Sequence, residues 1–403
     1  MRWSIHRAWI IVVVMALLGL AGPGVVVEAG RTNDELAEPL ADKAQLAELL
    51  QAGQYGTAAS QTNRLRRRDT VTFSQLVAEA SAEAEANPTS LDSLSLLALL
   101  FWADARDEMA LPLYEALLQV DPNNVFAFLF RGSSSIFLGD SIRGTADFQQ
   151  AVNLDPENAQ VYSVIGSTHQ QTGSPADALI ALDQAVKLDP QDSRSHYYRG
   201  MALLDEANPQ AAKTAFQTAL DSRPGFADAW YDLARADLQL DSPAEAMRDL
   251  DQAVEVDPAF GLALVFRGAM KEWSGERAAA ATDYLSYIQA IHPQYVDEGP
   301  ITTGNPASIL VGADTVHSFR LAGASGQHVT IVAEPQQADL DPVIVLLSTD
   351  GVTPLEGSDR PNPNERTAQI EDYTLPAEGD YTILIAFSDF VQTGQVVVTV
   401  TAQ

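Results

Sequence analysis

The sequence of 403 residues contains no cysteine. Disulfide bonds, thiol catalysis and cysteine-ligated metal sites are therefore excluded, although this absence alone does not decide the compartment. Basic residues are scarce as well, since 24 lysines and arginines stand against 54 acidic residues, for a formal net charge of −30. Such a surface has no net attraction for phosphate, so nucleic acid is not an expected partner, whereas a basic protein segment is.

Familiar catalytic motifs are also missing. The sequence has no His-Glu-x-x-His metal motif, no phosphate-binding glycine loop and no Gly-x-Ser-x-Gly nucleophile elbow. Its six histidines are scattered, and only His317 and His328 fall on predicted neighbouring strands, where the two could face one another as an alternative to being ordinary surface histidines. We therefore predict a protein that is not an enzyme and that needs no cofactor.

The N-terminus combines basic residues with an unbroken run of apolar residues and glycine. Arg2 and Arg7 precede the run Trp9–Leu20, and Gly22-Pro23-Gly24 follows it. This pattern predicts an export signal in residues 1–29, cleaved after Ala29, and then a flexible polar lead in residues 30–41. The alternative is an uncleaved anchor, which would be the one predicted contact with a membrane. In both cases we expect the rest of the chain outside the cytoplasm, secreted or in the cell envelope.

What the sequence does contain is a period of 34 residues. Prolines recur at this spacing, and most of them follow an aspartate that closes an apolar-periodic segment. Proline cannot continue a helix, but it suits the first helical position after an N-cap residue. The period therefore predicts stacked helical hairpins. The prolines at helix ends are Pro88, Pro122, Pro156, Pro190, Pro224 and Pro258, and those at helix starts are Pro175, Pro209 and Pro243.

Small residues recur in the same phase. Gly132, Gly166, Gly200 and Gly268 each lie ten residues after a proline, and glycine inside a helix indicates that another helix must approach closely. Together with alanines in the second helix, this pattern resembles the tetratricopeptide repeat. The resemblance implies six repeats over residues 89–293, in a right-handed solenoid of helical hairpins. Residues 42–88 are also predicted to be helical, and a degenerate first repeat is one interpretation of them.

Arginine stands just before the glycine in three repeats. For two of these arginines an aspartate follows sixteen residues later, which predicts an ion pair between the two helices of the hairpin. The third, Arg199, has Ala215 at that place, so contact with an anion at the surface is the alternative for it. The two predicted pairs are Arg131–Asp147 and Arg267–Asp283.

The resemblance implies that the first helix of each repeat lines an inner groove. At positions that the family's pattern assigns to that surface lie Arg194, Tyr197, Tyr231, Arg235 and Trp273. Tyrosine, arginine and tryptophan are the residue types that carry most binding energy at protein interfaces. We therefore predict that these five residues contact an extended peptide or a partner's helix. The alternative is that they coat a solvent-filled groove or pack against the C-terminal domain.

From about residue 300 the apolar pattern changes to a period of two, with turn signals every ten or so residues. This predicts a β-sandwich over residues 306–403, after a linker at 294–305. The segments Phe319-Arg320-Leu321 and Gly379-Asp380-Tyr381-Thr382 resemble the bacterial pre-peptidase C-terminal domain. That resemblance implies a jelly-roll-like sandwich with an accessory role in binding or secretion.

Three acidic residues in this domain are weak candidates for calcium ligands, namely Asp339, Asp341 and Asp359, with solvated loop carboxylates as the favoured alternative. The function we predict is an exported scaffold that binds a protein or peptide. Two alternatives are an envelope assembly or adhesion factor, in which the β-sandwich is the binding module, and an accessory subunit of a secreted hydrolase.

Overall fold

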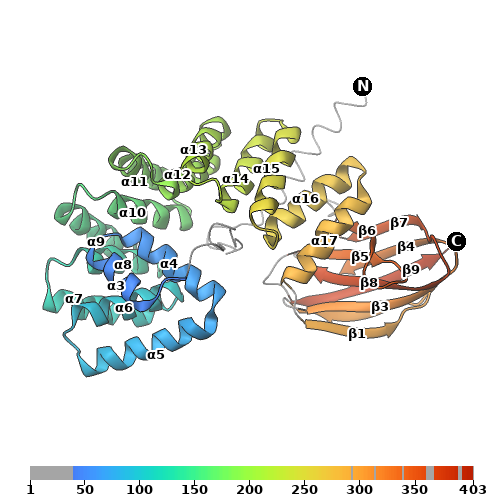
Figure 1. Cartoon of the computed structure of the whole chain (residues 1–403), viewed down its shortest axis with the longest axis horizontal. Coiled ribbons are helices and arrows are strands. Elements are labelled where there is room, and N and C mark those ends of the chain that lie inside the picture. The colour runs from blue at the N-terminus through green and yellow to red at the C-terminus, as the bar shows by residue number, and fades with distance from the viewer. Residues whose placement is uncertain are drawn as a thin grey trace. The chain divides into compact units, whose positions relative to one another are not determined.

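The computed structural model divides the chain into two compact units, Leu36–Pro224 and a unit that contains Gly225–Gln403 (Figure 1). The predicted signal and most of the predicted lead lie outside the described residues. None of the helices in the described part of the chain is long and apolar enough to cross a membrane. The structure describes residues 40–291, 294–312, 315–337, 340–359, 367–388 and 393–402.

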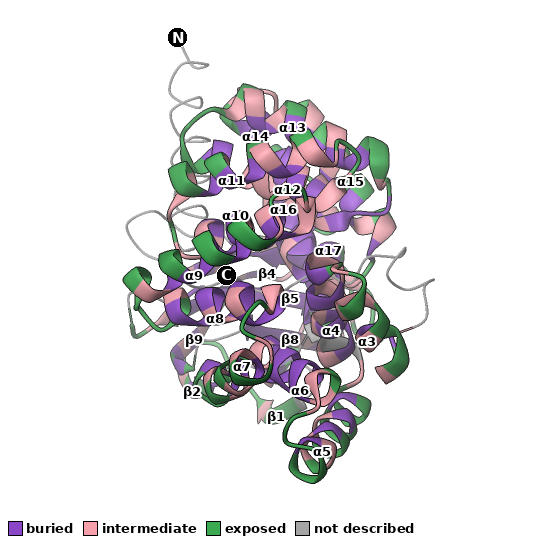
Figure 2. Cartoon of the chain, turned by 90° about the vertical axis from the view of Figure 1, so that its left-hand side faces the viewer, coloured by how far each residue is buried: buried purple, intermediate pink, exposed green. Residues whose placement is uncertain are grey.

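In the unit Leu36–Pro224, three helices precede a series of helical hairpins. The three are α3 (Lys43–Gln51), α4 (Tyr55–Arg68) and α5 (Thr70–Ala86). The hairpins are α6 (Leu91–Ala103) with α7 (Asp107–Val120), α8 (Val125–Phe137) with α9 (Ser141–Leu154), α10 (Ala159–Gln171) with α11 (Pro175–Leu188), and α12 (Ser193–Asp205) with α13 (Pro209–Ser222). Figure 2 shows the buried residues of α6 and α8 and the exposed outer side of α5.

Two further hairpins begin the other unit, α14 (Ala227–Gln239) with α15 (Pro243–Val256) and α16 (Gly261–Ser274) with α17 (Arg277–Ile291). First helices thus begin every 34 residues from Leu91 to Gly261. Three second helices begin at the prolines that the sequence assigned to helix starts. The predicted fold class of helical hairpins followed by a β-sandwich is confirmed.

The recurring glycines are where the two helices of a hairpin meet. A Cβ atom on Gly200 would lie 2.5 Å from the Phe216 ring, and one on Gly268 would lie 2.6 Å from the Tyr284 ring. Real side chains do not approach so closely, and a larger residue would push the helices apart. The close approach predicted from the glycine pattern is therefore present in both units.

The three arginines that stand just before a glycine of the repeat are all paired. Two of them donate two hydrogen bonds to the aspartate sixteen residues later, at 2.6–3.0 Å, as predicted. The third donates from Nε to an aspartate sixteen residues earlier, on the preceding second helix, at 2.7 Å. Its interpretation as a free anion contact is therefore wrong, because an acid on the other neighbouring helix takes the charge. The pairs are Arg131–Asp147, Arg267–Asp283 and Arg199–Asp183.

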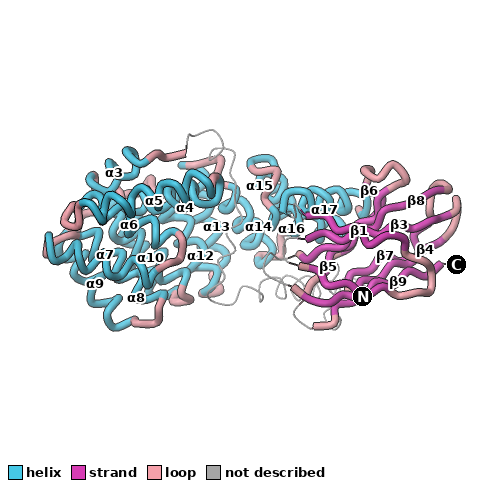
Figure 3. The backbone as a smooth tube through the Cα atoms, turned by 90° about the horizontal axis from the view of Figure 1, so that it is seen from below, coloured by secondary structure: helices cyan, strands magenta, loops and turns pink. Residues whose placement is uncertain are grey.

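The strands of the second unit form two sheets (Figure 3). One sheet has the order β1-β3-β8-β5-β6 and the other β2-β9-β4-β7, and every pair is antiparallel except β1 with β3. The strands are β1 (Gln294–Pro300), β2 (Ala307–Val311), β3 (Thr315–Gly323), β4 (His328–Pro335), β5 (Pro342–Leu347), β6 (Pro354–Ser358), β7 (Ala368–Thr374), β8 (Gly379–Phe387) and β9 (Gly394–Ala402).

Strand β1 lies in the segment predicted as a linker. Its residues Tyr295–Glu298 are all exposed, so its sequence lacks the alternation by which a half-buried strand is found. By contrast, all residues of β5 are buried. Helix α17 covers the outer face of β5 and β6, and a Cβ atom on Gly357 would lie 2.8 Å from the Ala281 Cα. In this unit the last hairpin and the sandwich therefore share a core.

Candidate functional site

The first helices α6, α8, α10 and α12 contact one another in order and form a surface that we call the A face. Hydrogen bonds to side-chain hydroxyl groups join these first helices. The Trp102 indole donates to Ser133 Oγ at 3.4 Å, and Ser133 Oγ lies 2.9 Å from Thr168 Oγ1. Ser195 Oγ in turn donates to Ser163 Oγ at 2.9 Å. These contacts could not be found in the sequence, because the paired residues do not share one phase of the repeat.

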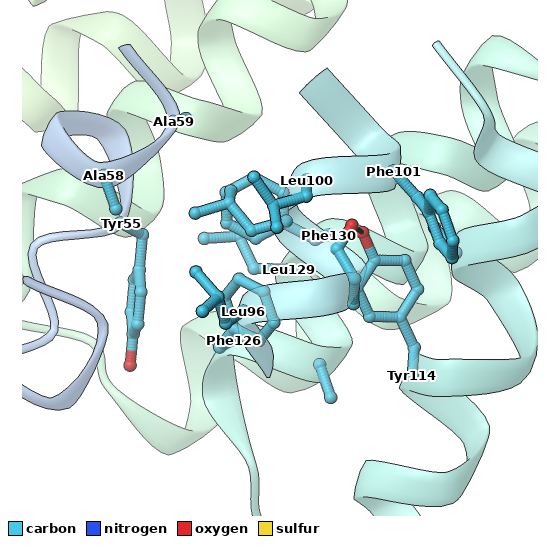
Figure 4. Packing of buried hydrophobic residues seen from close by; sticks show 14 of the residues in the cluster. Tyr55, Ala58, Ala59, Leu96, Leu100, Phe101, Tyr114, Phe126, Leu129 and Phe130 are labelled. Carbon is cyan, nitrogen blue, oxygen red and sulfur yellow. Dashed lines mark hydrogen bonds between the residues drawn. The ribbon is translucent and has the colours of Figure 1, made fainter. Parts of the chain in front are cut away.

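Helix α4 packs on the A face through small side chains and one aromatic ring. Tyr55, at its start, lies with its ring centroid 6.3 Å from that of Phe126, and burial and the charge of Asp155 raise the pKa of Tyr55 to about 12. Ala58 and Ala59 are buried against the same cluster of residues, as Figure 4 shows. The inner surface that the resemblance implied is therefore covered, within this unit, by a helix of the same chain.

Hydrogen bonds to main-chain carbonyls fix the start of α4. Asn158, the N-cap of α10, donates from Nδ2 to the Gly53 carbonyl at 3.1 Å, and Arg194 of α12 donates from Nη1 to the Gly56 carbonyl at 2.8 Å. A Cβ atom on Gly56 would lie 2.8 Å from Gln160 Oε1. Side chains of two hairpins thus hold the backbone of a third element that arrives from far away in the sequence.

The five predicted contact residues are divided between the two units. Arg194 and Tyr197 belong to Leu36–Pro224, where Arg194 is engaged with α4. Tyr197 is half-buried on α12, with its ring centroid 6.0 Å from that of Phe216 on the second helix of the same hairpin and 5.3 Å from that of Tyr198. Arg194 therefore contacts helix α4, which is packed on the A face, whereas the ring contacts of Tyr197 are with its own hairpin.

Tyr231 and Arg235 belong to the other unit and have local roles there. Tyr231 packs between Phe260 and Phe266, at centroid distances of 5.5 and 5.8 Å, and burial raises its pKa to about 12. Arg235 Nη1 donates to the buried carboxylate of Asp232 at 2.5 Å. Sequence position alone could not reveal these neighbours.

Helix α16 carries the fifth predicted residue, Trp273, which is 50% exposed. Its neighbour Glu272 is buried and accepts hydrogen bonds from the Tyr284 hydroxyl at 3.1 Å, the Ser358 hydroxyl at 3.0 Å and the Asp359 N–H at 3.2 Å. This first helix therefore holds the end of β6 with a carboxylate, whereas α10 and α12 hold α4 with hydrogen-bond donors.

Two of the three calcium candidates are buried side chains, and the third, Asp339, lies outside the described residues. Asp341 accepts a hydrogen bond from Ser388 Oγ at 2.8 Å. Burial raises the pKa of Asp359 well above its usual range, and the charges of Asp341 and Glu272 raise it further. Solvated loop carboxylates are therefore the wrong description of Asp341 and Asp359. Across the described ranges, no group of three or more acidic or histidine residues is placed to hold a metal ion.

The two histidines for which facing one another was the alternative lie in different sheets. His317, on β3, is buried and its Nδ1 lies 2.7 Å from Glu298 Oε1. His328, on β4, has its Nδ1 2.8 Å from Asp372 Oδ1. The two strands do not pair, because the chain crosses from one sheet to the other between β3 and β4, so the two histidines do not face one another as strand neighbours.

Models of a known protein family match the region of the helical hairpins. Two models of the tetratricopeptide repeat match, one over residues 137–193 and 163–206 and the other over residues 203–262. A search of curated proteins finds no match to this chain.

Among solved structures, the chain is similar to MamA, with 24% identity over 40% of this chain and 94% of that one and a TM-score of 0.37. It is similar to YrrB, described as a TPR protein with an unusual peptide-binding site, with 24% identity, coverage of 46% and 95%, and a TM-score of 0.35. It is also similar to pilF of Pseudomonas aeruginosa, with 18% identity, coverage of 49% and 90%, and a TM-score of 0.44. The matched segments and the hairpins at a 34-residue period establish that this chain carries tetratricopeptide repeats.

Proposed function

We propose that this protein is a non-enzymatic scaffold that binds another protein, and that its A face holds an extended peptide or a helix of that partner. One observation carries the proposal. The A face already holds a helix, α4, and it does so by donating hydrogen bonds from Asn158 and Arg194 to main-chain carbonyls. Contacts with main-chain groups do not depend on the sequence of the bound segment, so the same donors can serve a partner.

The partner segment is basic in this proposal. The chain carries a formal net charge of −30, and opposite charge speeds association and favours one partner over another. Helix α4 supports the same choice, since its second half contains a run of arginines that begins at Arg64 and includes Arg66.

We further propose that the protein is exported and that its β-sandwich is related to the pre-peptidase C-terminal domain, with an accessory role. The basic and apolar residues of 1–29 support export. The motif residues support the relationship, because Leu321 of the first segment lies opposite Tyr381 of the second across β3 and β8.

Photo-crosslinking tests the A face as the binding surface. A full-length chain with p-benzoylphenylalanine in place of Tyr197 is exposed to the envelope fraction of its native cell, and crosslinked proteins are identified by mass spectrometry. The matched control carries the same group in place of Gln217, which is exposed on the second helix α13. We expect a crosslinked partner with a basic segment from position 197 alone.

Equal crosslinking from positions 197 and 217 would contradict the proposal. A third variant carries the group in place of Leu310, which is 67% exposed on β2. Crosslinking from position 310 alone would instead favour the β-sandwich as the binding module, and turnover of a substrate by the pure protein would overturn the non-enzymatic assignment.

A further inference from the structure

Helix α4 does not sit where a preceding repeat would place its first helix. Such a helix would pair with α5 and contact α6, its neighbour in the array. Helix α4 does contact α5 and α6, but it also reaches α10, which a neighbouring repeat would not do, and Arg194 of α12 binds the carbonyl of Gly56, which is 138 positions away in the sequence. The α3–α4 segment therefore crosses the A face as a ligand would, and does not extend the array as a repeat would.

The sequence of α4 makes a poor helix by itself. It contains Gly56, Thr57, Thr62 and Asn63, all residues of low helix propensity, within one element of fourteen residues. Its N-cap, Gln54, makes no side-chain capping hydrogen bond. Short helices with such composition are marginal in water, so the helical state of α4 depends on its contact with the A face.

The contact between α4 and the A face is also modest. Tyr55 and Leu65 are the only large apolar residues of α4, and its other buried residues up to Arg66 are Ala58, Ala59, Thr62 and Arg64. The Thr62 hydroxyl donates to the Ala58 carbonyl of its own helix at 2.8 Å. Because stabilisation by burial scales with apolar area, α4 can leave the A face without removing the apolar seams between the two helices of each hairpin.

We propose that α3 and α4 form an intramolecular ligand that covers the A face and that a partner binds by displacing them. The inference rests on the proposed function of the A face and specifies its ligand. That ligand is a basic helix that begins with an aromatic residue and a glycine, continues with small residues, and offers two carbonyls to Asn158 and Arg194. The chain's own segment 52–68 is the pattern for it.

A peptide added in trans tests this directly. A fluorescent peptide of residues 52–68 is titrated into the full-length chain and into an Ala58→Arg variant, in which a long charged side chain would stand at a fully buried position on the face of α4 that packs against the A face. We expect at least tenfold tighter peptide binding by the variant, because the tethered copy no longer competes at its high effective concentration. The control Ala78→Arg, at an exposed position of α5, should bind as the unaltered chain does.

Peptide binding by Ala58→Arg that is no tighter than by the unaltered chain would overturn the proposal. A locked variant covers the case in which Ala58→Arg fails to fold. A Cβ atom on Gly56 would lie 3.8 Å from Val164 Cγ2, so Gly56→Cys with Val164→Cys can close a disulfide, and the chain has no other cysteine.

We expect the oxidised form of the locked variant to exclude the peptide and the reduced form to bind it. Equal binding by the two forms would contradict the proposal. Neither peptide-binding measurement needs the natural partner. Both can therefore be interpreted even if the crosslinking experiment finds no partner. Conversely, a partner that crosslinks at position 197 equally well in the oxidised and reduced forms would support the proposed function and refute the displacement.

Discussion

First helices of the repeat meet different elements in the two compact units. In Leu36–Pro224, α10 and α12 face helix α4 and hold it with hydrogen-bond donors, namely Asn158 and Arg194. In the unit with the β-sandwich, α16 faces the end of β6 and holds it with an acceptor, the buried carboxylate of Glu272. Both units contain a hairpin in which a glycine of the first helix lies under an aromatic ring of the second, while Leu182 takes the place of the ring over Gly166. The repeat therefore supplies a constant seam, while the outward residues of the first helix decide what it can hold.

The largest effect on stability is expected at the hairpin glycines, which the two units have in common. Gly200→Val and Gly268→Val place a branched side chain against Phe216 or Tyr284 and should each lower the free energy of unfolding by about 3 kcal/mol. Denaturant titration measures the change. Gln217→Val, at an exposed position of the same hairpin as Gly200, should stay within about 0.5 kcal/mol. A loss below about 1 kcal/mol at either glycine would break the claim of a common seam.

A smaller effect on stability should be confined to the unit with the β-sandwich. Glu272→Ala leaves the buried hydroxyls of Tyr284 and Ser358 without their acceptor, at a cost of about 2 kcal/mol after relief of repulsion on Asp359. Hydrogen exchange of α4 should not change. Faster exchange of α4 in this variant would show that the two kinds of contact are not independent.

The pH dependence of stability should distinguish the carboxylate contact further. Because burial raises the pKa of Asp359 in the folded state, its protonated form stabilises the fold below the usual carboxyl range, and that stabilisation is lost as pH rises through the raised value. Asp359→Asn should therefore be the more stable form at neutral pH, by about 1.4 kcal/mol for each unit by which the pKa is raised. Stability curves of the two forms that run parallel from pH 4 to pH 8 would contradict this.

The smallest effect concerns the donor that binds α4. Arg194→Ala removes one hydrogen bond to the Gly56 carbonyl, which corresponds to about 1 kcal/mol and to several-fold faster exchange of α4 amides. Arg199→Ala, on the same helix but paired with Asp183, is the matched control and should leave α4 exchange unchanged. Equal acceleration by both substitutions would mean that α12 acts on α4 only through general stability.

The sequence predicted those parts of the fold that are built by repetition. Each hairpin must bury the same seam, so Gly132 and its equivalents recur in phase, and the strands with a buried face, such as β4, alternate visibly. Edge strand β1 has no such pattern, because its residues are exposed.

The candidate site was predictable only in part. The family's positions pointed to Arg194, which binds the Gly56 carbonyl of the same chain, but they could not show that Tyr231 is enclosed by Phe260 and Phe266. The docking of α4 left no signal in the sequence, because it uses backbone carbonyls and small side chains, which carry no periodic pattern.

Hydrogen exchange of the full-length chain, resolved by mass spectrometry, tests the central claim most directly. If α4 is a separable ligand of the A face, amides of residues 55–66 are protected, yet they exchange through local opening well before those of α8 and α10. Exchange of these amides at the rate of an unstructured chain would show that α4 is not docked. Exchange only together with α8 and α10 would show that α4 is a fixed part of the repeat array.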